Sequence, residues 1–312
     1  MKIRLIRGLF SRVLSGPVFS AARIPLYVWA SLVSQILIVV TGGVVRLTGS
    51  GLGCPTWPKC TAESLVNTPE MGIHGIIEFA NRLLTFVLAV IAILTFVTIV
   101  RLGKQLRKGL FVPALILGLG IPAQAVLGGF TVLFNLNPWF VGAHFVLSAF
   151  MISMASLLVW RAIVTEHTPV SPAIWQMTNP IAAVGVITVL VGVLVTGAGP
   201  HSGDAESPRN GLDLDIWQHF HSYPAYLMLL LVLVQCWLLI RRDGKVLGSY
   251  QARVVTLLLV VTILQAIIGV AQARLGVPPL LVGLHMLGAS VLCSLLTFQW
   301  LVVRGKTRAQ VL

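Results

Sequence analysis

Eight stretches of apolar sequence, each long enough to cross a bilayer as a helix, follow one another along this chain of 312 residues. About 20 residues of helix cross roughly 30 Å of hydrocarbon. The stretches lie near residues 26–46, 72–100, 111–133, 140–162, 176–197, 216–240, 253–273 and 280–303. Only 10% of the residues are charged, whereas soluble domains carry about a quarter. We therefore predict an all-α integral membrane protein with eight transmembrane helices.

The net charge of +13 is distributed by side of the membrane. With these spans, 17 of the 22 Lys and Arg residues fall on the side that holds both termini. Six of the nine acidic residues fall on the opposite side. Cytoplasmic loops carry such a basic excess, so both termini are predicted to be cytoplasmic, in a bacterial plasma membrane. The charge thus indicates topology and argues against a nucleic-acid partner.

An internal repeat divides the chain into halves. The segment Gln124–Gly129 (QAVLGG) resembles Gln265–Val270 (QAIIGV), and Val141–His144 (VGAH) resembles Val282–His285 (VGLH), both at an offset of 141 residues. Two matches at one offset, one of them carrying a histidine, indicate a duplicated unit. Four spans per half give both halves one orientation, with a pseudo-twofold axis along the membrane normal.

The repeat sets the expected organisation of the chain. We expect a cytoplasmic N-terminal arm over residues 1–25 and a first four-helix half over 26–165. A second four-helix half is expected over 173–304, followed by a cytoplasmic tail over 305–312. The arm is read as retained, because basic residues interrupt any signal-peptide core.

Polar residues inside the spans mark the candidate site, because ionisable groups are costly in lipid. The second span carries four such residues on one helical face: His74, Glu78, Asn81 and Arg82. The fourth, sixth and eighth spans carry histidines: His144, His219, His221 and His285. All of these spans enter from the outer side, so these groups share a depth in the outer half of the bilayer.

The second half offers two histidines on neighbouring helices. His221 and His285 would form an axial pair for heme iron, and the repeat favours His221 over His219. In the first half, His144 has Asn81 as its counterpart, with His74 further out. That arrangement leaves iron ligation one-sided and favours chemistry over simple electron transfer.

Some of these residues have structural interpretations that stay open. Glu78 and Arg82, four residues apart, would also form an internal ion pair. Cys54 and Cys60, on the oxidising side, form either a disulfide or a reactive thiol pair that passes electrons or binds metal.

The chain resembles the heme A synthase family over nearly its whole length. The resemblance rests on the segment Thr41–Cys54 with the following Trp57-Pro58, on Glu78–Arg82, and on the histidines of the fourth, sixth and eighth spans. This family oxidises a methyl group of heme O to a formyl group, giving heme A. The resemblance implies two successive hydroxylations, through a gem-diol that loses water.

The resemblance also implies which residues act. A cofactor heme b would lie between His221 and His285, and substrate heme O in the first half, with Glu78 essential and His144 near the iron. Arg82 would balance the charge of Glu78 or bind a propionate. The family commonly has a histidine where this chain has Asn81, so one ligand suffices there or His74 substitutes.

The expected partners follow from the same resemblance. They are heme O, heme A, membrane lipid and an unidentified electron donor. The heme O-making enzyme, oxidase assembly factors and a second copy of the chain are further candidates. The main alternative function is a multi-heme transmembrane cytochrome that carries electrons without substrate chemistry. A heme-free transporter is a second alternative, disfavoured because the inner halves of the spans carry almost no charge.

Overall fold

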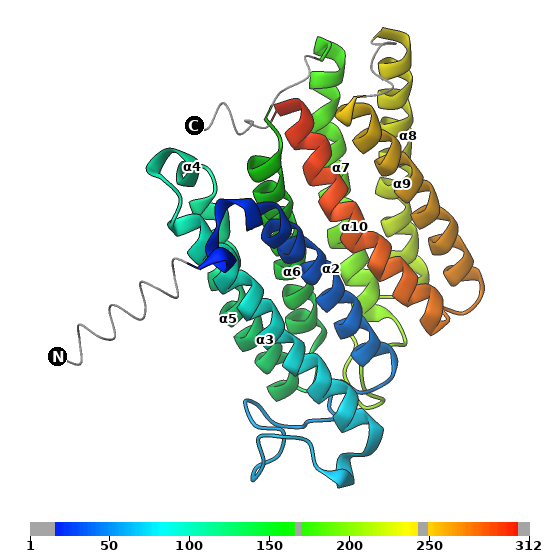
Figure 1. The fold of residues 1–312 in the computed structure, drawn as a ribbon. Coiled ribbons are helices and arrows are strands. Elements are labelled where there is room, and N and C mark those ends of the chain that lie inside the picture. The colour runs from blue at the N-terminus through cyan, green and yellow to red at the C-terminus, as the bar shows by residue number, and fades with distance from the viewer. Residues whose placement is uncertain (1–15, 166–169, 243–248, 305–312) are drawn as a thin grey trace, which may run out of the picture.

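The computed structural model describes residues 16–165, 170–242 and 249–304. In this part of the chain all regular secondary structure is helical, and loops connect the helices (Figure 1). The long helices are α2 (Ile24–Leu47), α3 (Gly72–Val100), α5 (Phe111–Leu133), α6 (Pro138–Ile163), α7 (Pro172–Ala198), α8 (Leu214–Arg242), α9 (Tyr250–Arg274) and α10 (Pro279–Arg304). The short elements are η1 (Pro17–Phe19), η2 (Ala21–Arg23), η3 (Pro69–Met71) and α4 (Lys104–Lys108). Among the described residues, eight helices are long and apolar enough to cross a membrane. The prediction of an all-α protein with eight such helices is confirmed.

Local sequence explains where several helices begin. Proline occupies the first position of α6 and of α7, where its missing N–H costs nothing and its fixed φ suits a helix. Asn137 caps α6 by accepting a hydrogen bond from the Trp139 N–H at 3.0 Å. Ser249 caps α9 in the same way through the Ala252 N–H. These caps set the helix ends that the apolar pattern alone left uncertain by several residues.

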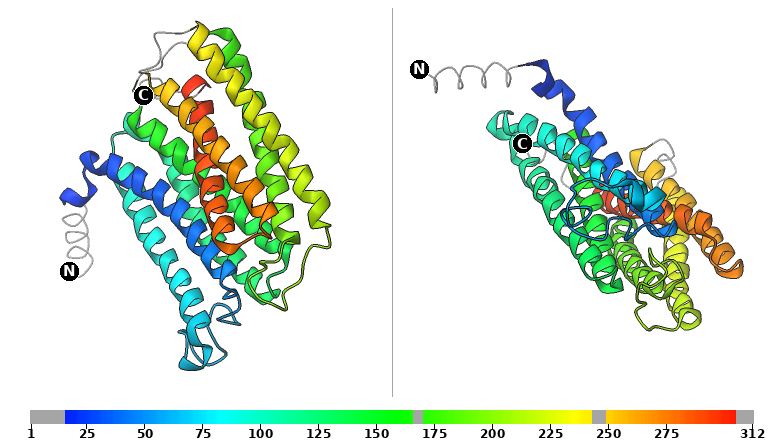
Figure 2. Two further views of the ribbon diagram at one scale, coloured as in Figure 1. Left: turned by 90° about the vertical axis from the view of Figure 1, so that its right-hand side faces the viewer. Right: turned by 90° about the horizontal axis from the view of Figure 1, so that it is seen from below.

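The long helices pack as two rings of four. In the first ring α2 contacts α3, α3 contacts α5, α5 contacts α6, and α6 closes onto α2. In the second ring α7, α8, α9 and α10 make the same succession of contacts. The rings meet where α10 contacts α2 and α6, and where α6 contacts α7 (Figures 1 and 2). The division of the chain into halves over 26–165 and 173–304, and a pseudo-twofold relation between them, stay predictions.

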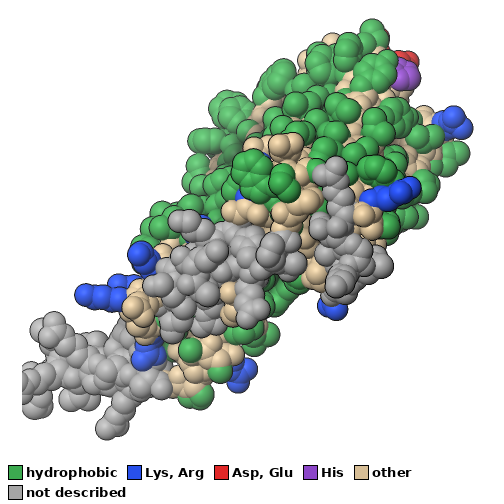
Figure 3. Space-filling view, turned by 90° about the horizontal axis from the view of Figure 1, so that it is seen from above, with side chains coloured by type: hydrophobic (Ala, Val, Ile, Leu, Met, Phe, Trp, Pro, Cys, Tyr) green, Lys and Arg blue, Asp and Glu red, His purple; other side chains and the backbone are tan. Residues whose placement is uncertain are grey.

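The two ends of the bundle differ in their connections. One end, uppermost in Figure 1, holds α4, the C-terminal end of α6 and the C-terminal end of α8. Lys and Arg side chains are seen at this end among hydrophobic ones (Figure 3). The opposite end holds the long loops 48–71 and 199–213. Most of the predicted arm, the junction between the halves at 166–169, and the tail over 305–312 lie outside the described residues.

Apolar side chains fill the core of the bundle and also cover much of its outside. Val28 and Leu32 of α2 are buried in a core that also receives α3, α5, α6 and α10. Large apolar side chains such as Phe86, Val90 and Ile93 lie exposed on the outside of α3. An apolar exterior of this extent suits contact with lipid. The helices therefore form a multi-pass membrane protein.

Candidate functional site

Two histidines face each other across the second ring of helices. The ring centres of His221 on α8 and His285 on α10 lie 6.1 Å apart, with an interplanar angle of 79°. Nδ1 of His221 is 3.0 Å from the carbonyl oxygen of Thr188 on α7. A carbonyl only accepts, so Nδ1 carries the hydrogen and Nε2 keeps its lone pair. His219, two residues earlier on α8, is exposed.

The spacing of these rings suits a metal ion between them. A bond from a metal to an imidazole nitrogen is about 2 Å long, so two rings on opposite sides of one ion have centres roughly 6 Å apart. Iron in a porphyrin takes four ligands from the macrocycle and accepts axial imidazoles. The side chains of His221 and His285 therefore fit the axial positions of a heme.

Each of these rings lies against a glycine of the preceding helix. A methyl group at Gly192 of α7 would stand 2.9 Å from Cε1 of His221. A methyl group at Gly269 of α9 would stand 3.5 Å from Cε1 of His285. The absence of side chains at these positions makes room for the imidazoles. Neither glycine was predicted as a site residue from the sequence, although Gly269 belongs to the repeated segment.

The first ring of helices repeats this arrangement with one change. His144 of α6 lies against Gly128 of α5, where a methyl group would stand 3.2 Å from Cε1 of the imidazole. Asn81 of α3 takes the remaining position, with its Nδ2 4.0 Å from where a side chain at Gly42 of α2 would begin. Nδ1 of His144 and Oδ1 of Asn81 are buried with no hydrogen-bond partner in the described part of the chain. Unpaired buried polar atoms are uncommon, which suits a site that a ligand completes.

A matched pair of hydrogen bonds supports both α6 and α10. Nε2 of Gln124 donates to the carbonyl oxygen of His144 at 3.3 Å. Nε2 of Gln265 donates to the carbonyl oxygen of His285 at 3.1 Å. Donors and acceptors are related by the same 141-residue offset that the sequence repeat shows. The repeated glutamine was the available signal for these positioning contacts, which the sequence analysis missed.

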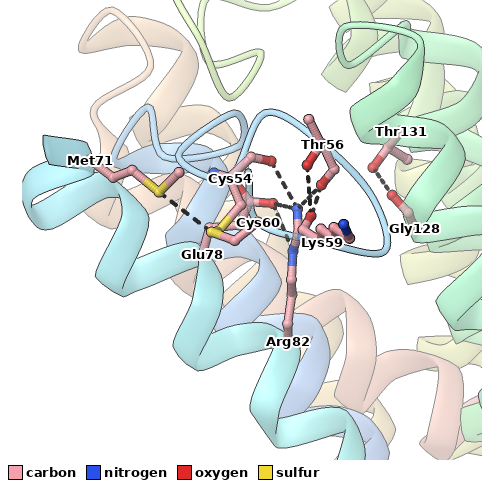
Figure 4. A network of polar contacts seen from close by, with 9 residues as sticks. All are labelled: Cys54, Thr56, Lys59, Cys60, Met71, Glu78, Arg82, Gly128 and Thr131. Atoms are coloured by element: carbon pink, nitrogen blue, oxygen red, sulfur yellow. Dashed lines mark hydrogen bonds and ion pairs between the residues drawn. A yellow bond between two sulfur atoms is a disulfide. The ribbon is translucent and has the colours of Figure 1, made fainter. Parts of the chain in front are cut away.

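Glu78 forms an ion pair that also holds the loop over residues 48–71, between α2 and α3. Its Oε1 accepts from Arg82 Nη2 at 2.5 Å and Nε at 3.1 Å, and its Oε2 accepts from the Cys54 N–H at 2.7 Å. The Arg82 guanidinium also donates to the carbonyl oxygens of Cys54, Thr56 and Lys59 (Figure 4). Every N–H of Arg82 thus has an acceptor within the protein, which leaves none for a propionate. The ion pair, one of the two interpretations of these residues, is present.

The loop held by Arg82 is closed by a disulfide. Cys54 and Cys60 are bonded, with their Cα atoms 4.4 Å apart, and Sγ of Cys60 contacts Sδ of Met71 at 3.5 Å. The Trp57 ring packs on Gly129 of α5, close enough that a side chain at Gly129 would overlap it. The disulfide loop is therefore fastened to α3 by hydrogen bonds and to α5 by packing, beside the first-ring site.

His74 also belongs to this loop anchor. Its Nδ1 lies 2.9 Å from Oγ of Ser50, which is in turn 2.8 Å from Oγ1 of Thr48. The backbone at Gly53 lies so close to the His74 carbonyl group that a side chain at Gly53 would overlap it. His74 is exposed, and its role as an iron ligand stays a prediction.

Together, the helices and these side chains define a multi-pass membrane protein with facing histidines in one ring and a disulfide-closed loop at one end. Residues 25–297 match the cytochrome oxidase assembly protein family, and the chain belongs to that family. The resemblance inferred from the sequence motifs is thereby confirmed.

Similar proteins indicate which members of this family the chain resembles. The chain is 31% identical over 171 residues to the heme A synthase of Bacillus pumilus, covering 53% of this chain and 54% of that protein. It is 36% identical over 141 residues to the heme A synthase of Lysinibacillus sphaericus, covering 44% and 43%. A shorter match, 37% over 62 residues, is to the protoheme IX farnesyltransferase of Thermus thermophilus and covers 20% of this chain and 10% of that protein. The alignments span about half the length of the curated heme A synthases.

Proposed function

We propose that this protein is a heme A synthase, an oxidoreductase that converts a methyl group of heme O to the formyl group of heme A. Two hydroxylations at one carbon, each of which needs an oxidant and an oxygen source from outside the protein, would give a gem-diol, and loss of water would give the aldehyde. The observation that carries the proposal is the facing pair of His221 and His285 at 6.1 Å in a member of this family. The heme A synthases among its relatives support it.

In the second half, His221 and His285 would hold heme b. When bound, heme b supplies one-electron transfer. The Thr188 carbonyl would keep the Nδ1 hydrogen of His221 in place, so that Nε2 faces the metal. With two imidazoles to hold the heme, this half would serve electron transfer rather than substrate turnover.

In the first half, substrate heme O would lie by His144 and Asn81. Their buried, unpaired Nδ1 and Oδ1 atoms support a polar ligand there. This half offers one imidazole, that of His144, where the second half offers two, which would suit the binding of a substrate rather than of a resident electron carrier. The disulfide loop, fastened by Glu78 and Arg82, would cover the outer end of this half and limit access of water.

Orientation and partners belong to the same proposal. The basic end of the bundle would face the cytoplasm of a bacterial cell, with both heme sites toward the outer side. The electron donor and the enzyme that makes heme O would be its partners, and the two rings of helices would be related by a pseudo-twofold axis.

The test is extraction and chromatography of hemes from membranes that contain the full chain together with a heme O source. The expected result is heme A formation, lost in His144→Ala with heme b still bound. In His285→Ala, heme b itself should be lost. His219→Ala is the matched control, because its ring is exposed on the same helix. Bound heme b without heme A under any electron donor would instead support the electron-carrying cytochrome.

A further inference from the structure

Arg46, in the last turn of α2, is a cation at the seam between the two rings of helices. Its Nη2 donates to the carbonyl oxygen of Thr196, 150 residues away in the last turn of α7, at 2.6 Å. Its Nε is buried with no hydrogen-bond partner in the described part of the chain. The guanidinium is therefore partly withdrawn from solvent and has unused N–H groups.

No carboxylate balances this charge within the described residues, where the one ion pair joins Arg82 to Glu78. Burial removes Arg46 from water, and the positive charge of Arg209, in the loop after α7, adds an unfavourable interaction. Arg209 itself donates to the carbonyl oxygens of Ser207 and Pro200. Two neighbouring cations without an acid favour the binding of an anion.

Contacts of neighbouring residues show where Arg46 lies along the bundle axis relative to the histidines. On α2, Gly42 lies beside Asn81, and a methyl group at Gly43 would stand 2.9 Å from Met286, the residue after His285. Arg46 follows within one helical turn, about 5 Å nearer the outer end. It therefore lies just outward of the level at which the imidazoles sit.

The residues that contact Arg46 belong to the second ring of helices and to its loop after α7. Thr196 belongs to α7, Arg209 to the loop that follows it, and Gly203 of that loop packs against the stem of Arg46. Arg82, the other arginine near the sites, has all of its N–H groups occupied. Arg46 thus has N–H donors to spare next to the second ring, just outward of the His221–His285 pair.

We propose that Arg46 binds a carboxylate, one of the two propionate groups of the heme held between His221 and His285. This inference rests on the proposed function, because it requires heme in the second half. The propionates would point outward, where the loops are polar, and away from the apolar interior of the bundle. An anionic lipid phosphate shares the same hydrogen-bonding chemistry, so the experiment must separate the two sources.

The experiment compares two ligands in two proteins. The full chain is produced in a heme-deficient host supplied with either protoheme or its dimethyl ester, which lacks both carboxylates. Loss of each ligand to excess apomyoglobin is followed in wild type and in Arg46→Gln. A charge-assisted hydrogen bond lost here should accelerate protoheme loss by about 10- to 100-fold. Loss of the ester should be equally fast in both proteins.

Controls and alternative outcomes separate the explanations. Arg274→Gln, an exposed arginine at the end of α9, should change neither rate. Arg46→Lys is the second variant, for the case that Arg46→Gln folds poorly. Because lysine keeps the positive charge, protoheme loss from Arg46→Lys should be slow, as it is from wild type. The proposal is overturned if Arg46→Gln accelerates the loss of protoheme and the loss of the ester equally. It is also overturned if both rates of loss are unchanged in Arg46→Gln and less phospholipid phosphorus copurifies with that variant than with wild type. Wild-type protein that takes up no heme would instead overturn the proposed function.

Discussion

Replacing Gly192 by alanine tests whether His221 depends on the space that this glycine leaves. The new methyl group would lie 2.9 Å from Cε1 and 3.2 Å from Nδ1 of the imidazole. Non-bonded carbons prefer about 3.5–4.0 Å, so the ring must move by roughly half an ångström or more. That movement would lengthen the 3.0 Å hydrogen bond to the Thr188 carbonyl and change the approach to His285.

The matched substitution is Gly269→Ala on the other side of the histidine pair. There the methyl group would lie 3.5 Å from Cε1 of His285, which is an ordinary contact. Overpacking of a well-packed site costs about 1–3 kcal/mol, which corresponds to about 5- to 150-fold weaker heme binding at Gly192→Ala. Gly269→Ala should be close to neutral. Both substitutions replace glycine in a helix, so the gain of about 1 kcal/mol in helix propensity cancels in the comparison.

The assay is the ratio of heme b to protein in purified wild type and in the two variants, together with the rate of heme loss. Melting temperature, measured in the same detergent, shows whether each variant is folded. We expect heme to be depleted in Gly192→Ala and retained in Gly269→Ala. If the two variants lose heme equally, or Gly269→Ala loses more, the packing of His221 against α7 does not control the site.

The remaining predictions concern the first ring of helices and its disulfide loop. Arg82→Gln should destabilise the protein by about 3–5 kcal/mol, because the buried Glu78 carboxylate loses its partner. Thermal melting measures this loss of stability, and an unchanged melting temperature would show that the ion pair does not stabilise the fold. Alkylation and mass spectrometry without reductant should leave Cys54 and Cys60 unmodified, and two free thiols would contradict the disulfide. The disulfide loop should contribute about 2–3 kcal/mol to stability. Asn81→His should add a second imidazole to the first-half site and convert its heme to a six-coordinate, low-spin spectrum; an unchanged spectrum would remove Asn81 from the site.

Much of the fold follows from local sequence. The predicted spans match the helices to within a few residues, because the length of an apolar segment and its flanking charges act locally. Caps and prolines such as Asn137 and Pro172 set the remaining boundaries. The repeat offset of 141 residues anticipated which residues correspond, and the Gln124 and Gln265 hydrogen bonds follow the same offset.

The candidate site could be predicted only in part. Sequence placed the histidines at a common depth, and the repeat favoured His221, which lies opposite His285 in the structure. Sequence alone left Glu78 with two interpretations. The structure adds that its second oxygen accepts from the Cys54 N–H, 24 residues away. That contact depends on how the loop returns to α3, which no periodicity encodes.

The sequence by itself determined the number of helices long and apolar enough to span a membrane and the repeat that relates His144 to His285, because both depend on spacing along one chain. Tertiary structure decided which faces meet. The packing of His221 on Gly192 and the bond from Arg46 to Thr196 both join separate helices. Such contacts depend on the rotation and shift of one helix against another, and these are set by side-chain packing over the whole bundle.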